Sequence, residues 1–207
     1  PSALSPQPSA LNQSSDPMQL PQDLHIHTTW SDSDSSVVPE QTIALIAAVG
    51  HARVRGISDH FEMIDTRWDD YRAEVQAAGL RVGMEVNGHE WVPAALDADC
   101  DYRIYHCWDR DADYRALEHL LATGQPVIVA HPHALGTDLD RVPPECLVEI
   151  NNRYIWRCDW QAEYGPYVDR FRFVISSDAH QPNWLNQTIA RHAAAELGIA
   201  ETLLFDD

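Results

Sequence analysis

Residues 173–180 read FVISSDAH, an apolar run that ends directly in two residues able to bind a metal, Asp178 and His180. Short apolar runs of this kind recur along the chain, and helical patterns follow most of them. The expected strands are Leu24–His27, Val54–Ser58, Val82–Val86, Arg103–His106, Pro126–Ala130, Leu147–Ile150 and Phe173–Ser176. The expected helices are Glu40–Val49, Asp69–Ala78, Tyr114–Ala122, Gln161–Phe171 and Leu185–Leu197. This alternation predicts an α/β fold with a parallel sheet or barrel in a single domain.

Residues of the types that bind metals in proteins stand at the carboxyl ends of six of these expected strands. Such ends converge on one face of a barrel or an open α/β sheet, so we expect the side chains to meet there. A buried cluster of imidazoles and carboxylates is costly to desolvate, and divalent cations remove that cost. The residues are His25 and His27, His60, Glu85, His106, His131, and Asp178 with His180.

The sequence around these residues resembles the successive motifs of the PHP family, named for its polymerase and histidinol phosphatase domains. The matching strings are DLHIHTTWSDSD (23–34), GISDHFEM (56–63), GMEV (83–86), IYH (104–106), VIVAHPH (127–133) and SSDAH (176–180). Their order and approximate spacing match from Asp23 to His180, about three quarters of the chain. The resemblance implies a distorted seven-stranded (β/α)7 barrel, similar to a TIM barrel, with a trinuclear metal site.

Carried over motif by motif, the resemblance assigns ligands to three divalent metal ions. The sets are His25, His27, Glu85 and Asp178 for the first ion; Glu85, His106 and His131 for the second; and Asp32, His60 and His180 for the third. Imidazole and carboxylate ligands without Cys suit Zn²⁺, Mn²⁺ or Fe²⁺. The family usually has Ser-Asp-Gly after the first His pair, whereas this chain reads Ser31-Asp32-Ser33-Asp34, so Asp34 competes with Asp32 as a ligand.

The activity that the resemblance implies is hydrolysis of a small phosphate ester by a metal-dependent phosphoesterase (a phosphatase). The attacking group would be a hydroxide that bridges two metals. Catalytic roles are expected for His60, Glu85, Asp178 and His180, and Asp59 is a candidate to orient His60. Arg153, just beyond Leu147–Asn151, is the candidate phosphate clamp, and a surface ion pair is its alternative role.

Two other functions remain open from the sequence. A metal site in a β/α barrel also activates water for hydrolysis of C–N or C–O bonds. The site could instead serve only stability or partner binding, although a complete ligand set argues against that.

Other His and Trp residues have simpler expected roles. We expect His51, His119 and His192 to lie in helices and to serve packing or the surface. His89 is expected in a loop, and His133 beside the site. The seven Trp are expected mainly to pack under the barrel rim, with stacking on a substrate base as the alternative.

The charge and composition of the chain limit the kinds of molecule that it can bind. The 207 residues contain 32 acidic and 14 basic residues, a formal net charge of −18, and every basic residue is Arg. Long nucleic acids and anionic membranes are therefore disfavoured, and a small phosphoester is the expected substrate. No stretch approaches 18 consecutive apolar residues. The four Cys have no C-x-x-C spacing, which indicates free thiols and a cytoplasmic protein.

The expected domain organisation is a disordered leader over residues 1–22, rich in Pro, Ser and Gln, followed by one hydrolase domain over residues 23–207. The oligomeric state is left open.

Overall fold

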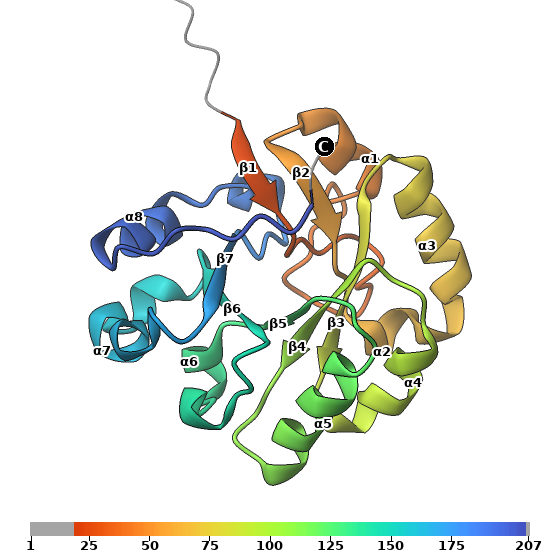
Figure 1. Ribbon diagram of the computed structural model, residues 1–207. Coiled ribbons are helices and arrows are strands. Elements are labelled where there is room, and N and C mark those ends of the chain that lie inside the picture. The colour runs from red at the N-terminus through yellow and green to blue at the C-terminus, as the bar shows by residue number, and fades with distance from the viewer. Residues whose placement is uncertain (1–18, 206–207) are drawn as a thin grey trace, which may run out of the picture.

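The computed structural model describes residues 19–205 and shows a nearly closed barrel of parallel strands surrounded by helices (Figure 1). Each strand pairs in parallel with the next one in sequence, which confirms the expected seven-stranded α/β barrel. The strands are β1 (Leu20–Asp23), β2 (Ala52–Ile57), β3 (Arg81–Asn87), β4 (Tyr102–His106), β5 (Val127–Val129), β6 (Leu147–Asn151) and β7 (Arg172–Ser176).

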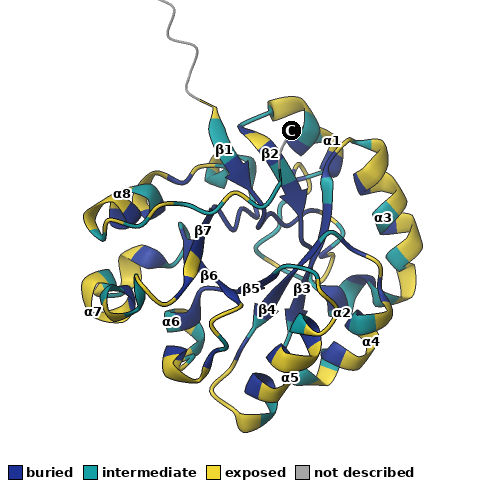
Figure 2. Ribbon diagram, viewed as in Figure 1, coloured by how far each residue is buried: buried dark blue, intermediate teal, exposed yellow. Residues whose placement is uncertain are grey.

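The helices lie on the outside of the barrel, with buried inner faces and exposed outer faces (Figure 2). They are α1 (Ile43–Val49), α2 (Phe61–Ile64), α3 (Trp68–Ala77), α4 (Val92–Asp97), α5 (Asp111–Leu121), α6 (Pro132–Leu135), α7 (Trp160–Tyr164) and α8 (Thr188–Glu196). Short 3₁₀ turns join them at η1 (Asp65–Arg67), η2 (His89–Trp91), η3 (Leu139–Arg141), η4 (Ile155–Arg157), η5 (Gly165–Tyr167) and η6 (Pro182–Trp184).

The first and last strands meet at their carboxyl ends. Just beyond these strands, Ile26 forms a parallel bridge with Ala179, and the backbone N–H of His27 donates to the Ala179 carbonyl at 2.9 Å. At the opposite end the C-terminal segment lies against β7, where the N–H of Thr202 donates to the Phe173 carbonyl at 2.7 Å. The barrel is therefore closed directly at the end where the candidate metal-binding residues lie.

The lower interior of the barrel, toward the amino ends of the strands, is apolar. Tyr102 fills it, and its hydroxyl donates to the Leu24 carbonyl at 2.6 Å. Gly56 and Gly83 lie under this ring, since a Cβ at either position would overlap the Tyr102 side chain. The apolar side chains gathered here are Leu24, Val54, Tyr102, Ile104, Ile128, Ala130, Leu147 and Val174, with Leu204 and Phe205 packed against them.

The strand expected at Leu24–His27 lies instead at Leu20–Asp23 (β1), and the other expected elements differ mainly at their boundaries. The helix expected at Gln161–Phe171 ends at Tyr164, because Pro166 lacks the N–H that a continuing helix needs. The helix expected at Glu40–Val49 begins only at Ile43, where Thr42 caps it. No helical pattern in the sequence predicts the short helices α2, α4 and α6.

The expected leader boundary is also wrong, because Leu20–Asp23 form β1 and pair with β2. The rest of the predicted leader, residues 1–18, lies outside the described residues. Within residues 19–205, no helix is long and apolar enough to cross a membrane.

Candidate metal centre

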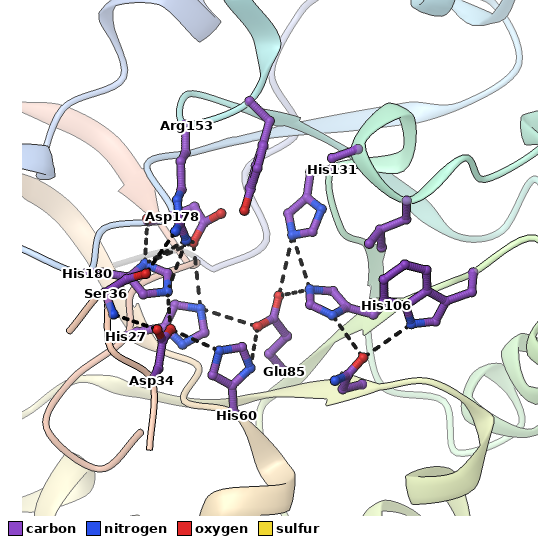
Figure 3. Close-up of a pocket in the computed structure, with 15 residues that line it drawn as sticks. His27, Asp34, Ser36, His60, Glu85, His106, His131, Arg153, Asp178 and His180 are labelled. Carbon is purple, nitrogen blue, oxygen red and sulfur yellow. Dashed lines mark hydrogen bonds and ion pairs between the residues drawn. The ribbon is translucent and has the colours of Figure 1, made fainter. Parts of the chain in front are cut away.

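Nine side chains of the types that bind metals meet near the carboxyl ends of the strands, and all of them except His25 line a cavity of about 370 Å³ (Figure 3). Glu85, at the end of β3, points into the middle of them, with imidazoles on both sides. Eight of the nine are residues expected from the sequence, and the ninth is Asp34. The nine are His25, His27, Asp34, His60, Glu85, His106, His131, Asp178 and His180.

The first group of donors is His25, His27, Glu85 and Asp178. The Nε2 atoms of His25 and His27 lie 3.1 Å apart, and they lie 3.0 and 3.3 Å from the two Glu85 oxygens. Asp178 Oδ1 is 3.8 Å from the first of these nitrogens and 3.7 Å from the second. These atoms converge in the way that ligands of a single cation do.

The second group shares Glu85 with the first. His106 Nε2 lies 2.5 Å from Glu85 Oε1 and 3.1 Å from His131 Nε2, while His131 Nε2 is 3.7 Å from the same oxygen. Glu85 Oε1 is buried and has no hydrogen-bond partner of good geometry within the described part of the chain. A carboxylate oxygen that faces two imidazoles in this way is suited to binding a cation.

The third group contains Asp34 in place of Asp32. Asp34 Oδ2 lies 2.9 Å from His180 Nε2 and 3.4 Å from His60 Nε2. Asp32 is half exposed and pairs instead with Arg67 at 2.9 Å, so its assignment as a ligand is corrected. The physical reason is a tight turn, closed by the N–H of Asp34 on the Ser31 carbonyl at 3.0 Å, which directs the second Asp inward.

Three of the imidazoles hold Nδ1 against an oxygen and turn Nε2 toward the cluster. The pairs are His25 with Glu149 Oε1 at 2.7 Å, His106 with Asn87 Oδ1 at 3.3 Å, and His180 with the Asp178 carbonyl at 3.0 Å. An acceptor at Nδ1 places the proton there and leaves the Nε2 lone pair free for a cation. His25 and His106 therefore present Nε2 to a metal ion, whereas Arg153 Nη1 lies 3.1 Å from His180 Nε2, and His60 turns Nδ1 to Glu85 Oε2 at 2.9 Å.

Glu149 supports the cluster, and the sequence reasoning missed it. It is fully buried, and its Oε2 accepts from the His131 N–H at 2.8 Å and from Asn151 Nδ2 at 2.9 Å. Asn151 Nδ2 also reaches Asp178 Oδ2 at 3.1 Å, so one network joins β6 to ligands from three other segments. The available signal was the two-residue spacing of Glu149 and Asn151, which places both on the inner face of the strand.

The backbone is strained at two of the candidate ligands. Within residues 19–205, the non-glycine residues with positive φ are His131 (21°) and Asp178 (54°). Such conformations cost about 1–3 kcal/mol each and gather at functional sites. Both residues lie two positions beyond the end of a strand, where this backbone conformation turns their side chains into the cluster.

The buried carboxylates and imidazoles of the cluster strongly shift one another's pKa values. Burial would raise the pKa of Glu85, yet the imidazoles of His106, His25 and His60 outweigh it and hold that pKa well below its ordinary value. Burial would lower the pKa of His60, but Glu85 and Asp34 raise it to about 10. Without a cation, protonated imidazoles must balance the buried carboxylates, and a divalent ion can replace those protons.

No family model and no curated protein matches the chain. Solved structures do share its fold. A sugar phosphate isomerase/epimerase from Parabacteroides distasonis aligns with a TM-score of 0.51 at 16% identity, covering 93% of this chain and 88% of that one. A truncated 3-deoxy-D-arabino-heptulosonate 7-phosphate synthase from Thermotoga maritima aligns with a TM-score of 0.49 at 13% identity, covering 87% of this chain and 74% of that one. At such identities the first likeness shows the barrel fold alone, and the second carries no argument.

Arg153, the expected phosphate clamp, lies in the cavity rather than in a surface ion pair (Figure 3). Its Nη1 is 3.5 Å from Asp178 Oδ1 and 3.1 Å from His180 Nε2, and its Nη2 donates to Ser36 Oγ at 3.3 Å. The cavity thus has a fixed guanidinium at one side of the metal-ligand cluster.

Asp59 has a different role from the one expected. It does not contact the His60 ring; its Oδ1 accepts from the Thr28 N–H and from Ser31 Oγ, both at 2.7 Å. Burial raises the pKa of this carboxyl to about 6. Asp59 therefore fixes the loop that carries Asp34.

The remaining His residues lie outside the cluster. His133 contacts the Tyr154 carbonyl at 3.1 Å. His89 lies 3.2 Å from Asp113, in a short 3₁₀ turn, and His51 follows α1 rather than lying in it. His119 and His192 lie in α5 and α8, as expected.

Proposed function

We propose that this chain is a metal-dependent hydrolase of small phosphate esters, the activity implied by its resemblance to the PHP family. The observation that carries the proposal is the central position of Glu85, whose two oxygens face imidazoles of all three donor groups. Nitrogen and oxygen donors without sulfur suit Zn²⁺, Mn²⁺ or Fe²⁺. The three ions would be held by the nine residues above, with Asp34 in the third set.

Bound divalent ions supply two effects at such a site: they lower the pKa of water, and they offset the charge of a phosphoryl group. The chain itself contributes the placement. Glu149 and Asn151 orient ligands that follow three different strands. Arg153 has donors on the cavity side and would bind a non-bridging phosphate oxygen.

Size and charge favour a small substrate. A cavity of about 370 Å³ lies near the lower end of the range for ligand pockets, about 300–1,000 Å³. The formal net charge of −18 disfavours long polyanions, while bound cations and Arg153 make the site itself locally positive.

Arg153 also bears on the alternative functions. A guanidinium beside the cluster favours an anionic substrate over a neutral amide or lactone. The strained backbone at His131 and Asp178 is difficult to explain if the cluster serves stability alone. Because the Parabacteroides neighbour is described as acting on a sugar phosphate, sugar phosphates belong in any substrate panel.

The test combines elemental analysis with a panel of phosphomonoesters, amides and lactones, with Mn²⁺, Zn²⁺ and Fe²⁺ supplied. We expect about three bound ions and turnover of the phosphomonoesters. Asp34→Asn should lose about one equivalent of metal and most activity, because it removes a ligand. Asp32→Asn is the matched control and should lose neither. Metal near zero with no activity in any added metal, or activity confined to amides and lactones, would refute the proposal.

A further inference from the structure

A second cavity of about 390 Å³ adjoins the metal centre and shares Arg153 with it. It lies between η4 and the segment that leads from η6 into α8. Trp156, Trp184 and Ile189 form its apolar surface. Trp156 is 57% exposed and Ile189 is 41% exposed, so two of the large apolar side chains exposed within residues 19–205 lie together in this cavity.

The exposed indole of Trp156 is held in a fixed position. Its Nε1 donates to the Arg153 carbonyl at 2.8 Å, so the ring is tied to the same residue that borders the metal centre. On the other side, the Arg153 guanidinium lies 5.2 Å from the Trp184 ring centroid. A ring that is oriented by its N–H while its face stays exposed is a preformed surface for a planar ligand.

The groove also carries an uncompensated positive charge. Arg157 lies 4.9 and 5.0 Å from the ring centroids of Tyr154 and Trp156, and it has no ion pair with a carboxylate anywhere in residues 19–205. Arg153, the other Arg that lines the groove, pairs with Asp178 at 3.5 Å, and within residues 19–205 six further Arg also pair with carboxylates. A guanidinium that stands between aromatic rings without one is suited to an anionic ligand group.

We propose that this groove binds the leaving group of the phosphate ester, and that this group contains an aromatic ring with an anionic substituent. The inference rests on the proposed hydrolysis. The phosphate would face Arg153 and the metal centre, the ring would stack on Trp156, and the substituent would pair with Arg157. Hydrolysis breaks the ester P–O bond, adds the water oxygen to phosphorus and delivers a proton to the departing aromatic alcohol.

Three substrates with the same kind of leaving oxygen test this proposal. They are 3-phenylpropyl phosphate, the derivative of this ester with a carboxylate at the para position of the ring, and 3-cyclohexylpropyl phosphate. All release a primary alcohol, so differences in kcat/KM report binding of the distal group rather than leaving-group reactivity. The wild-type protein should prefer the phenyl ester over the cyclohexyl ester, and the carboxylate over both.

The variants separate the two parts of the groove. Trp156→Ala should reduce the phenyl-to-cyclohexyl ratio about tenfold, the size of one stacking contact, and Trp156→Phe should restore most of it. Arg157→Gln should reduce the preference for the carboxylate about fivefold. Arg115→Gln, an exposed Arg on α5, is the matched control and should change neither ratio. Equal turnover of the three esters by the wild type, or ratios unchanged in Trp156→Ala, would overturn the proposal.

A binding measurement distinguishes this proposal from the hydrolysis on which it rests. The product 4-(3-hydroxypropyl)benzoate should shift the indole N–H signals of Trp156 and Trp184 in the NMR spectrum of the labelled protein. Arg157→Gln should weaken that binding. If no ester is hydrolysed but the shifts appear, the proposed function fails and the groove assignment stands. If the esters are hydrolysed without ring preference and without shifts, the groove assignment alone fails.

Discussion

The two ends of the barrel interior are built from the same strands and yet have opposite chemistry. On β3, Gly83 lies under the Tyr102 ring, and two residues later Glu85 faces the metal-ligand cluster. On β4, Ile104 is in the apolar interior, and two residues later His106 is in the cluster. In each strand, the change from the apolar interior to the polar cluster occurs between two successive inward-facing residues.

The two ends of the barrel interior therefore have separate roles, one in stability and one in chemistry. Apolar surface buried at the lower end contributes about 25 cal/mol per Å². The upper end buries carboxylates and imidazoles and strains the backbone at His131 and Asp178, all of which oppose folding without a cation. The comparison predicts that changes at the two ends have separable effects on metal binding and on stability.

The largest effect should follow from Glu85→Gln at the upper end. Because Glu85 faces all three donor groups, the variant should lose more than one equivalent of metal and nearly all hydrolysis. Elemental analysis and a phosphoester assay measure this, with Glu118→Gln, an exposed Glu on α5, as control. A Glu85→Gln protein with its full metal content would contradict the central role of Glu85 at the upper end.

At the lower end, Tyr102→Ala should leave a cavity and lower the free energy of unfolding by about 3–5 kcal/mol. Tyr102→Phe removes the hydroxyl that donates to the Leu24 carbonyl but keeps the ring, and it should cost about 1 kcal/mol. Denaturant unfolding measures both. Folded variants should keep their metal content, and loss of metal from folded Tyr102→Phe protein would show that the two ends are coupled.

Glu149→Gln should have an intermediate effect, because Glu149 orients ligands without being one of the nine. Replacing an oxygen that accepts from His25 with an amide should weaken metal binding about 10–100-fold. Competition with a chelator measures the change, and the exposed Glu145→Gln is the matched control. Affinity within threefold of the wild-type value would argue against this positioning role.

A pH dependence of stability should appear only when the upper end lacks metal. Glu85 and Asp34 outweigh burial and raise the pKa of His60 to about 10, above its ordinary value of 6.5. A pKa raised by folding stabilises the fold below the unfolded value, and this stabilisation is lost as pH rises toward the folded value. Chelated protein should therefore lose about 1.4 kcal/mol per pH unit from this proton between about pH 6.5 and 10.

Saturating metal should abolish that slope, because liganded imidazoles are already neutral. Thermal melts between pH 7 and 8.5, with chelator or with Mn²⁺, measure both cases. Equal slopes in the two conditions would contradict the metal assignment.

The sequence by itself determined the order of the strands and the convergence of eight of the nine donors. Strand alternation is local, and the carboxyl ends of parallel strands must share one face, so His106 or Asp178 could be placed without knowing any contact. The seven-stranded barrel came from the motif resemblance.

Only the tertiary structure decided which side chains of the loops and inner faces complete the site. Asp32 and Asp34 are equivalent in the sequence, but Asp59 on a distant segment fixes the turn that selects Asp34. Glu149 stands in an apolar run, and its role became visible only when the closed barrel brought it to His25. The groove at Trp156 likewise forms from segments about 30 residues apart. These outcomes depend on hydrogen bonds and packing between segments distant in sequence, which local periodicity does not encode.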